Sequence, residues 1–175
     1  MATSPWLIFA GYQAVWLACA LGAAAGSNLP GIAASLAFLA VTMLRSPHLR
    51  SDTITVLASG TVGLIAESLL KSTGLVGYAA TWPTVAVAPP WIVGLWLAFG
   101  MTMAPTARLL GDRRNLKAVL LGLVFGPLAY LAGDRLGTLE ITGSPIASYA
   151  SLAALWALAF PILLSLRARL PPPPQ

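Results

Sequence analysis

The sequence predicts an all-α polytopic membrane protein, built as one bundle of about six transmembrane helices with both termini in the cytoplasm. Hydrophobic residues make up 58% of the 175 residues and charged residues only 9%, whereas soluble domains carry about 25% charged residues. The apolar runs are spread along the chain without a long hydrophilic block between them. Residues 1–170 are therefore expected to form a single transmembrane domain, followed by a disordered proline-rich tail at 171–175.

Six apolar segments are long enough, or nearly long enough, to cross a hydrocarbon core, which requires about 20 residues. Backbone groups in lipid must be hydrogen-bonded within the segment, and these runs lack the alternating pattern of barrel strands, so each is expected to be a helix. The second segment is the shortest. The six segments are 6–26, 30–44, 53–70, 91–110, 116–136 and 146–166.

The boundaries of these segments carry residues that favour helix ends. The first segment follows MATSP, which has no basic residue, and its apolar run exceeds the roughly 7–15 residues of a signal peptide, so it is expected to remain as a helix. The other five begin beside residues that cap or open helices. In chain order these residues are Asn28 with Pro30, Asp52, Pro90, Asn115, and Ser144 with Pro145.

Basic residues are divided unevenly between the two ends of these segments. The side that holds the N-terminus collects eight of the ten Lys and Arg residues, and the other side holds only Lys71 and Arg135. Cytoplasmic loops carry the excess of Lys and Arg in membrane proteins, so both termini are expected in the cytoplasm of a bacterial inner membrane. Because the basic residues form no stripe, nucleic acid is not expected as a partner.

Little in the sequence points to a metal, a cofactor or a soluble type of active site. One cysteine, Cys19, and one histidine, His48, are too few soft ligands for a zinc, copper or haem site. The acidic residues are scattered, and no nucleophile, zinc-protease or phosphate-loop motif is present. No metal, cofactor or catalytic residue is therefore predicted, and an enzyme is the less favoured interpretation.

One connection, residues 71–90, is long, apolar and interrupted by Gly and Pro. Tyr78 and Trp82 lie within it, and Trp91 follows it. Amphipathic aromatic rings are favoured at the membrane interface, so this loop is expected to lie at the periplasmic interface. A partly re-entrant lid over the bundle is the alternative.

The fifth segment contains GLVFGPLAYLAGDRLG, in which small and polar residues share one helix face. Gly122 and Gly126 have the small-xxx-small spacing that lets a neighbouring helix approach closely, and Gly133 continues the small face. Proline inside a helix removes a backbone donor and favours a kink. The prolines inside predicted helices are Pro105, Pro127 and Pro161.

Glu67 is the strongest functional candidate among the acidic residues, because it lies about one turn inside the membrane, where a charge is costly. With Tyr130 and Asp134 it is expected to form a polar pocket that faces the periplasm. Two plainer alternatives stay open. Glu67 can pair with Lys71 one turn later, with both side chains reaching the headgroups, and Asp134 can pair with Arg135 at the end of its helix.

A second polar cluster lies in the first segment, nearer its cytoplasmic half, and consists of Tyr12, Gln13 and Trp16. A glutamine in lipid needs a hydrogen-bond partner, and such bonds between helices contribute about 0.6–2 kcal/mol. Gln13 and Trp16 are therefore candidates for the same ligand or partner pocket, and packing between helices is the other interpretation.

The chain resembles a family of small multi-pass bacterial inner-membrane proteins known as a domain of unknown function. The resemblance rests on YQAVWLA in the first segment, PPWIVGLWLAFGMTM at the start of the fourth, and GLVFGPLAYLAGDRLG in the fifth, together with the order of the segments. It implies an inner-membrane protein of about six helices with no established activity, and it favours a lipid-linked role.

These observations favour a non-enzymatic bundle that engages a lipid-like ligand or a partner membrane protein through the periplasm-facing pocket. A small transporter or permease component is the first alternative. An intramembrane lipid-modifying enzyme is the second, and it requires Glu67 and Asp134 to converge on one substrate. The sequence does not specify the oligomeric state.

Overall fold

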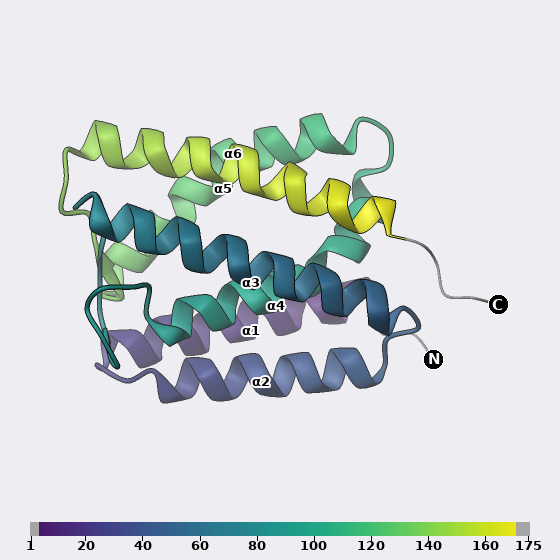
Figure 1. The fold of residues 1–175 in the computed structure, drawn as a ribbon, viewed down its shortest axis with the longest axis horizontal. Helices are drawn as coiled ribbons and strands as arrows, with labels where there is room; N and C mark the ends of the chain where they lie inside the picture. The colour runs from purple at the N-terminus through teal and green to yellow at the C-terminus, as the bar shows by residue number, and fades with distance from the viewer. Residues whose placement is uncertain (1–3, 171–175) are drawn as a thin grey trace.

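The computed structural model describes residues 4–170, which form six helices and two very short strands. The helices run up and down along the long axis of the molecule (Figure 1). The predicted tail at 171–175 lies outside the described residues. The elements are α1 (Pro5–Ala24), α2 (Leu29–Leu44), α3 (Leu49–Ser72), β1 (Gly77–Tyr78), α4 (Pro90–Leu110), α5 (Arg114–Arg135), β2 (Leu139–Glu140) and α6 (Pro145–Arg169).

Each of the six predicted segments is a helix, so the predicted all-α class is confirmed. Five of the helices, all except α2, are long and apolar enough to cross a membrane. Helix α2 has only 16 residues and is therefore shorter than the roughly 20-residue span of a hydrocarbon core. Large apolar side chains point outward around the bundle, among them Leu36, Leu64 and Ile162, as expected for a surface in contact with acyl chains.

The bundle has two different ends (Figure 1). At one end, which we call the terminal end, α1 begins and α6 finishes. At the other, which we call the sheet end, β1 pairs with β2 in an antiparallel register that places Gly77 opposite Glu140 and Tyr78 opposite Leu139. This pairing joins the loop after α3 to the loop after α5, and the backbone N–H of Ala79 extends it by donating to the carbonyl of Thr138 at 2.9 Å.

Helix α4 occupies the centre of the bundle and packs against α1, α2, α3 and α6. Apart from Thr102 and Thr106, its residues before Arg108 are apolar on every face, which is the pattern of a helix buried on all sides. Trp96 and Met103 on this helix are almost fully buried. Helix α3 meets it through small residues, since a Cβ atom added to Gly63 would lie 2.5 Å from the Cβ of Trp96.

Helices α5 and α6 pack along each other, and the small face of α5 lies at their contact. A Cβ added to Gly126 would lie 2.5 Å from the indole of Trp156, and one added to Gly122 would meet the backbone of the same residue. A Cβ added to Gly133 would lie 2.9 Å from the hydroxyl oxygen of Thr138. Pro105, Pro127 and Pro161 lie within the continuous helices α4, α5 and α6, and the kinks expected there stay a prediction.

The close contact at Gly122 predicts a loss of stability when a methyl group is added there. Gly122→Ala would push against the backbone carbonyl carbon of Trp156, 2.7 Å from the new Cβ, and overpacking of this kind costs about 1–3 kcal/mol. The free energy of unfolding, measured by SDS titration from detergent micelles, should fall by that amount. Val124→Ala is the matched control, because Val124 on the same helix is exposed; equal losses for both would contradict the prediction.

The fold places the basic residues as the positive-inside prediction requires. Lys71 and Arg135 lie where α3 and α5 finish at the sheet end, and the other eight Lys and Arg residues belong to the terminal end. We therefore expect the terminal end in the cytoplasm. In a Cys19→Ser background, a membrane-impermeant maleimide should label Glu140→Cys in spheroplasts and should label Arg113→Cys only after permeabilisation. The reverse pattern would invert the topology.

Candidate functional site

Glu67 lies on the buried face of α3, near the sheet end. Gly60, Gly63, Glu67 and Leu70 recur at intervals of three and four residues, so they share one side of the helix, and all four are buried. The two glycines bring α4 close to this face, and the side chain of Glu67 is therefore enclosed, with 0% of its surface exposed. A carboxyl group in such a place is costly unless its oxygens accept hydrogen bonds.

Three side chains from three other segments donate hydrogen bonds to the Glu67 carboxyl group. The indole N–H of Trp96 on α4 donates to Oε1 at 2.6 Å, and the hydroxyl of Tyr130 on α5 donates to the same oxygen. The hydroxyl of Tyr78 on β1 donates to Oε2 at 2.5 Å. We call these four residues the Glu67 cluster. One carboxyl group thus joins α3, α4, α5 and the loop that contains β1.

The alternative in which Glu67 pairs with Lys71 is wrong. The Nζ of Lys71 donates to the backbone carbonyl of Val87 at 3.1 Å, while Glu67 faces the bundle. The physical reason is that three neutral donors already satisfy the carboxyl group, whereas Lys71 lies at the end of α3 and can reach the loop. The pair of Asp134 with Arg135 is also not formed, because the one ion pair within residues 4–170 joins Asp52 to Arg167.

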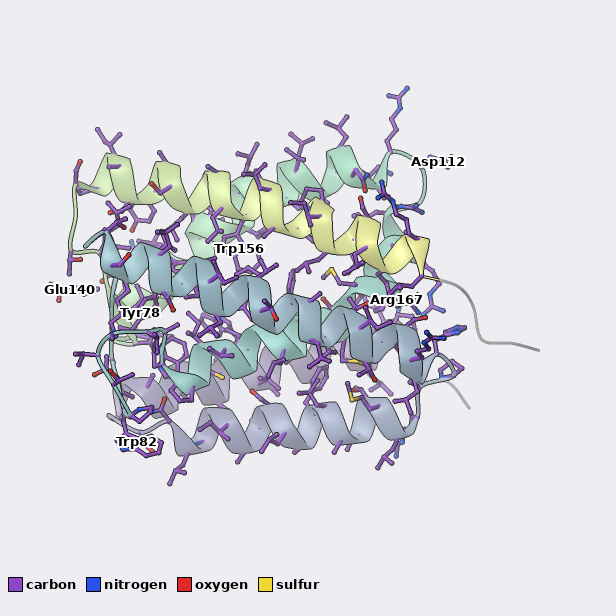
Figure 2. The ribbon with its side chains drawn as sticks, in the orientation of Figure 1. Tyr78, Trp82, Asp112, Glu140, Trp156 and Arg167 are labelled. Atoms are coloured by element: carbon purple, nitrogen blue, oxygen red, sulfur yellow. The ribbon has the colours of Figure 1, made fainter. Side chains whose placement is uncertain are left out.

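The loop between α3 and α4 covers the sheet end of the bundle. Tyr78 points into the bundle while Trp82 lies at its edge (Figure 2), and 72% of the Trp82 surface is exposed. Trp91 fixes this arrangement, because its indole N–H donates to the carbonyl of Ala79 at 3.0 Å, and the amide of Asn28 donates to the carbonyl of Ala80 at 2.8 Å. The loop therefore has an inner face over the bundle and an outer face, and its position relative to the membrane interface stays a prediction.

Tyr78 remains a neutral hydrogen-bond donor at physiological pH. Burial, and secondarily the nearby charge of Glu67, raises the pKa of the Tyr78 phenol well above its ordinary value. Its ring also packs against Trp91, with 6.2 Å between the ring centroids. This loop residue is therefore as much a part of the bundle core as the helical donors are.

A cavity of 490 Å³ extends from the Glu67 cluster toward the middle of the bundle. Its inner wall is aromatic: Trp96 and Trp156 stack with 4.5 Å between centroids, and Phe99 meets Trp156 edge-on at 5.2 Å. Figure 2 places Trp156 in the interior of the bundle, between the two ends. The volume lies in the range of small-molecule sites, which are mostly apolar with a few convergent polar groups.

The cavity opens sideways, between α1 and α5. Gln13 on α1 and Phe125 and Leu128 on α5 line it, and all three are exposed, Phe125 with 61% of its surface. In a membrane, this opening would face acyl chains and not bulk water.

The cavity unites four of the six residues predicted for the pocket, namely Gln13, Trp16, Glu67 and Tyr130. Asp134 and Arg135 do not line it. On α5 they are four and five residues beyond Tyr130, and Asp134 is partly exposed while Arg135 is exposed.

Sequence reasoning missed Tyr78 and Trp96, both of which are donors to Glu67. The need of a buried carboxyl group for hydrogen-bond donors was the one signal in the sequence that could have identified them. A carboxyl group inside an apolar bundle needs donors, and the buried donors of the sheet-end half include Tyr and Trp side chains.

The geometry of the Glu67 cluster predicts two different costs for two substitutions of Glu67. Glu67→Leu leaves three buried donors without an acceptor, and we expect it to lower the free energy of unfolding by about 3 kcal/mol or more, at roughly 1–3 kcal/mol for each unpaired group. Glu67→Gln should lower the free energy of unfolding by only about 1 kcal/mol. The amide oxygen can accept hydrogen bonds from Trp96 and Tyr130, while the amide nitrogen donates to the Tyr78 hydroxyl.

Unfolding by SDS titration measures both changes. Glu140→Leu is the control, because Glu140 is an exposed acidic residue at the same end, and such surface changes stay within about 0.5 kcal/mol. A Glu67→Leu variant as stable as the Glu140→Leu variant would show that the carboxyl group does not hold the cluster together.

Residues 5–162 match a known family, described as "Protein of unknown function (DUF2878)". The match covers the Glu67 cluster and every residue that lines the cavity, and it confirms the resemblance predicted from the sequence. No curated protein and no solved structure matches the chain.

Proposed function

The chain belongs to the DUF2878 family, and from this premise we propose that it is a non-enzymatic inner-membrane protein that binds a lipid-like amphiphile. The polar end of the ligand would meet the Glu67 cluster, and its apolar part would lie in the aromatic cavity and emerge between α1 and α5. The single observation that carries this proposal is a fully buried carboxyl group, held by three neutral donors, at the inner end of an otherwise apolar, laterally open cavity.

The acceptor capacity of Glu67 indicates what the polar end of the ligand must offer. A carboxylate has about four lone-pair positions, and the cluster uses two on Oε1 and one on Oε2. Oε2 therefore keeps one acceptor position, which a ligand would reach by displacing the side chains that enclose Glu67. The matching ligand group is a hydrogen-bond donor, such as a hydroxyl or an ammonium group, and the hydroxyl of Thr138 on the same wall can supply a second polar contact.

The shape of the cavity favours an amphiphile over a small polar solute. The aromatic wall contacts apolar chains or rings well, and the opening between α1 and α5 lies beside the exposed side chain of Phe125. A polar solute would have to cross acyl chains to reach this opening, whereas a membrane lipid can enter by lateral diffusion.

The two alternative functions have weaker geometric support. A lipid-modifying enzyme that uses two carboxyl groups requires Asp134 beside Glu67, and within residues 4–170 Glu67 is the one acidic residue that lines the cavity. A transporter requires a continuous aqueous path, but the cavity at Glu67 and the cavity at the terminal end share no lining residue. Transport would predict pH-dependent uptake that Glu67→Gln abolishes, whereas binding predicts no such uptake.

Glu67→Gln separates ligand binding from folding. The amide keeps the cluster together but turns the free acceptor on Oε2 into a donor. We therefore expect the purified variant to fold. It should retain less than about a tenth of the amphiphile that the unmodified protein carries, because losing a hydrogen bond to a charged group weakens binding by about 1.5–3 kcal/mol. Lipid mass spectrometry of protein purified in mild detergent measures the ratio of bound amphiphile to protein.

Two further variants make the result specific to the cavity. Glu140→Gln makes the same chemical change at an exposed position of the sheet end and should leave the bound amphiphile unchanged. Ala129→Trp adds bulk to the wall of the cavity at a residue that donates no hydrogen bond to Glu67 and should also remove the amphiphile. Equal amphiphile content in all four proteins would overturn the proposal.

A further inference from the structure

A second cavity lies at the terminal end of the bundle, opposite the Glu67 cluster, and has a volume of 600 Å³. It is lined by the ends of the helices and by the turns between α2 and α3 and between α4 and α5, and it is partly open. Figure 2 places Asp112 and Arg167, two of its lining residues, at the end opposite Tyr78 and Glu140. Unlike the first cavity, it is lined by many ionisable groups.

Arginine dominates the charge of this cavity. Four arginines line it, against two aspartates and one histidine. One aspartate is already neutralised: Asp52 accepts from the Nε of Arg167 at 3.1 Å and from the hydroxyl of Ser46 at 2.5 Å. The other, Asp112, is exposed. The four arginines are Arg45, Arg108, Arg114 and Arg167.

Three of the four arginines have no anionic partner in the part of the chain that the structure describes, where Arg167 makes the one ion pair. Guanidinium groups present planar forks of N–H donors that match phosphate oxygens. Arg45 comes from the end of α2, Arg108 from the end of α4 and Arg114 from the start of α5. Three separate elements thus bring unpaired guanidinium groups to one cavity.

Two further features of the cavity also suit an anion. Helices α3 and α5 both begin here, and neither has a side chain that caps its first N–H groups, so both present the positive end of the helix dipole. His48 lines the cavity as well, and its buried Nδ1 has no hydrogen-bond partner within residues 4–170. A buried nitrogen of this kind is normally satisfied by a ligand or by ordered water.

We propose that this cavity is a binding site for a phosphate group, held by Arg45, Arg108 and Arg114, with the Asp52–Arg167 pair fixing its wall. The cavity lies at the end of the bundle that the distribution of basic residues places in the cytoplasm, at the level of the lipid headgroups. The phosphate belongs either to an anionic phospholipid of the inner leaflet, since basic pockets between helices bind such headgroups, or to free phosphate. The site is independent of the Glu67 cavity.

Two double variants with the same change in charge test this site. All four arginines changed here are exposed. Arg45→Gln/Arg108→Gln removes two guanidinium groups that line the cavity, whereas Arg50→Gln/Arg113→Gln removes two at the same end that do not line it. Purified proteins in zwitterionic detergent are titrated with short-chain phosphatidylglycerol and, separately, with inorganic phosphate, and native mass spectrometry measures the bound fraction.

The double variant of the lining arginines should bind at least tenfold more weakly than the unmodified protein, and the double variant of the non-lining arginines should stay within about twofold. Binding of phosphatidylglycerol but not of inorganic phosphate supports a lipid headgroup as the source, and binding of both supports free phosphate. Equal weakening in the two double variants, or no saturable binding of either probe, overturns the site.

Two more proteins keep the result interpretable. Arg108→Lys keeps the charge but loses the planar fork, and it should fall between the unmodified protein and the double variant. It also provides an independent test of phosphate binding if the lining double variant does not fold. Glu67→Gln should bind both probes as the unmodified protein does, so failure of the amphiphile proposal and failure of this site are distinguishable.

Discussion

The requirement to satisfy one buried carboxyl group organises the sheet-end half of this bundle. A carboxyl group inside an apolar interior is tolerated only when its oxygens are hydrogen-bonded, and Glu67 obtains its donors from α4, α5 and β1. The packing around it follows from this requirement. Glycines on α3 bring Trp96 within reach, and the β1–β2 pairing holds Tyr78 in place. A polar group that would be costly alone thereby fixes the relative positions of four segments.

The two cavities divide the molecule into halves with different chemistry. The sheet-end half combines one carboxyl group with aromatic walls and a sideways opening, whereas the terminal end gathers guanidinium groups around its cavity. Both arrangements suit the two parts of membrane lipids, namely a hydrogen-bonding or phosphate-bearing head and an apolar body. An association with lipid is therefore the common element of both proposals, although each site stands on its own residues.

Much of the fold was predictable because hydrophobicity and helix ends are local properties. The six segments and the short α2 follow from run lengths. The predicted caps Asp52 and Asn115 instead lie inside α3 and α5, and neither helix has a side-chain cap. The inward direction of Glu67 was one of two open interpretations, because local sequence does not show which donors are near. Neighbouring helices were not predictable in the same way, since helices such as α4 are apolar on every face and periodicity does not identify a partner. The position of Tyr78 was not predictable for another reason. Strands β1 and β2 have two residues each, which are too few to show a strand pattern. Their pairing also joins loops about 60 residues apart in the sequence.

The order of the Glu67 cluster along the chain also bears on how the protein is made. Helix α3 leaves the ribosome before α4 and α5 do, so its carboxyl group emerges before Trp96 and Tyr130 can reach it. Tyr78 follows eleven residues later and is the first donor to emerge, while Tyr130 comes 63 residues after Glu67. Until its later neighbours arrive, the carboxyl group of nascent α3 has fewer hydrogen-bond donors than it has in the finished bundle.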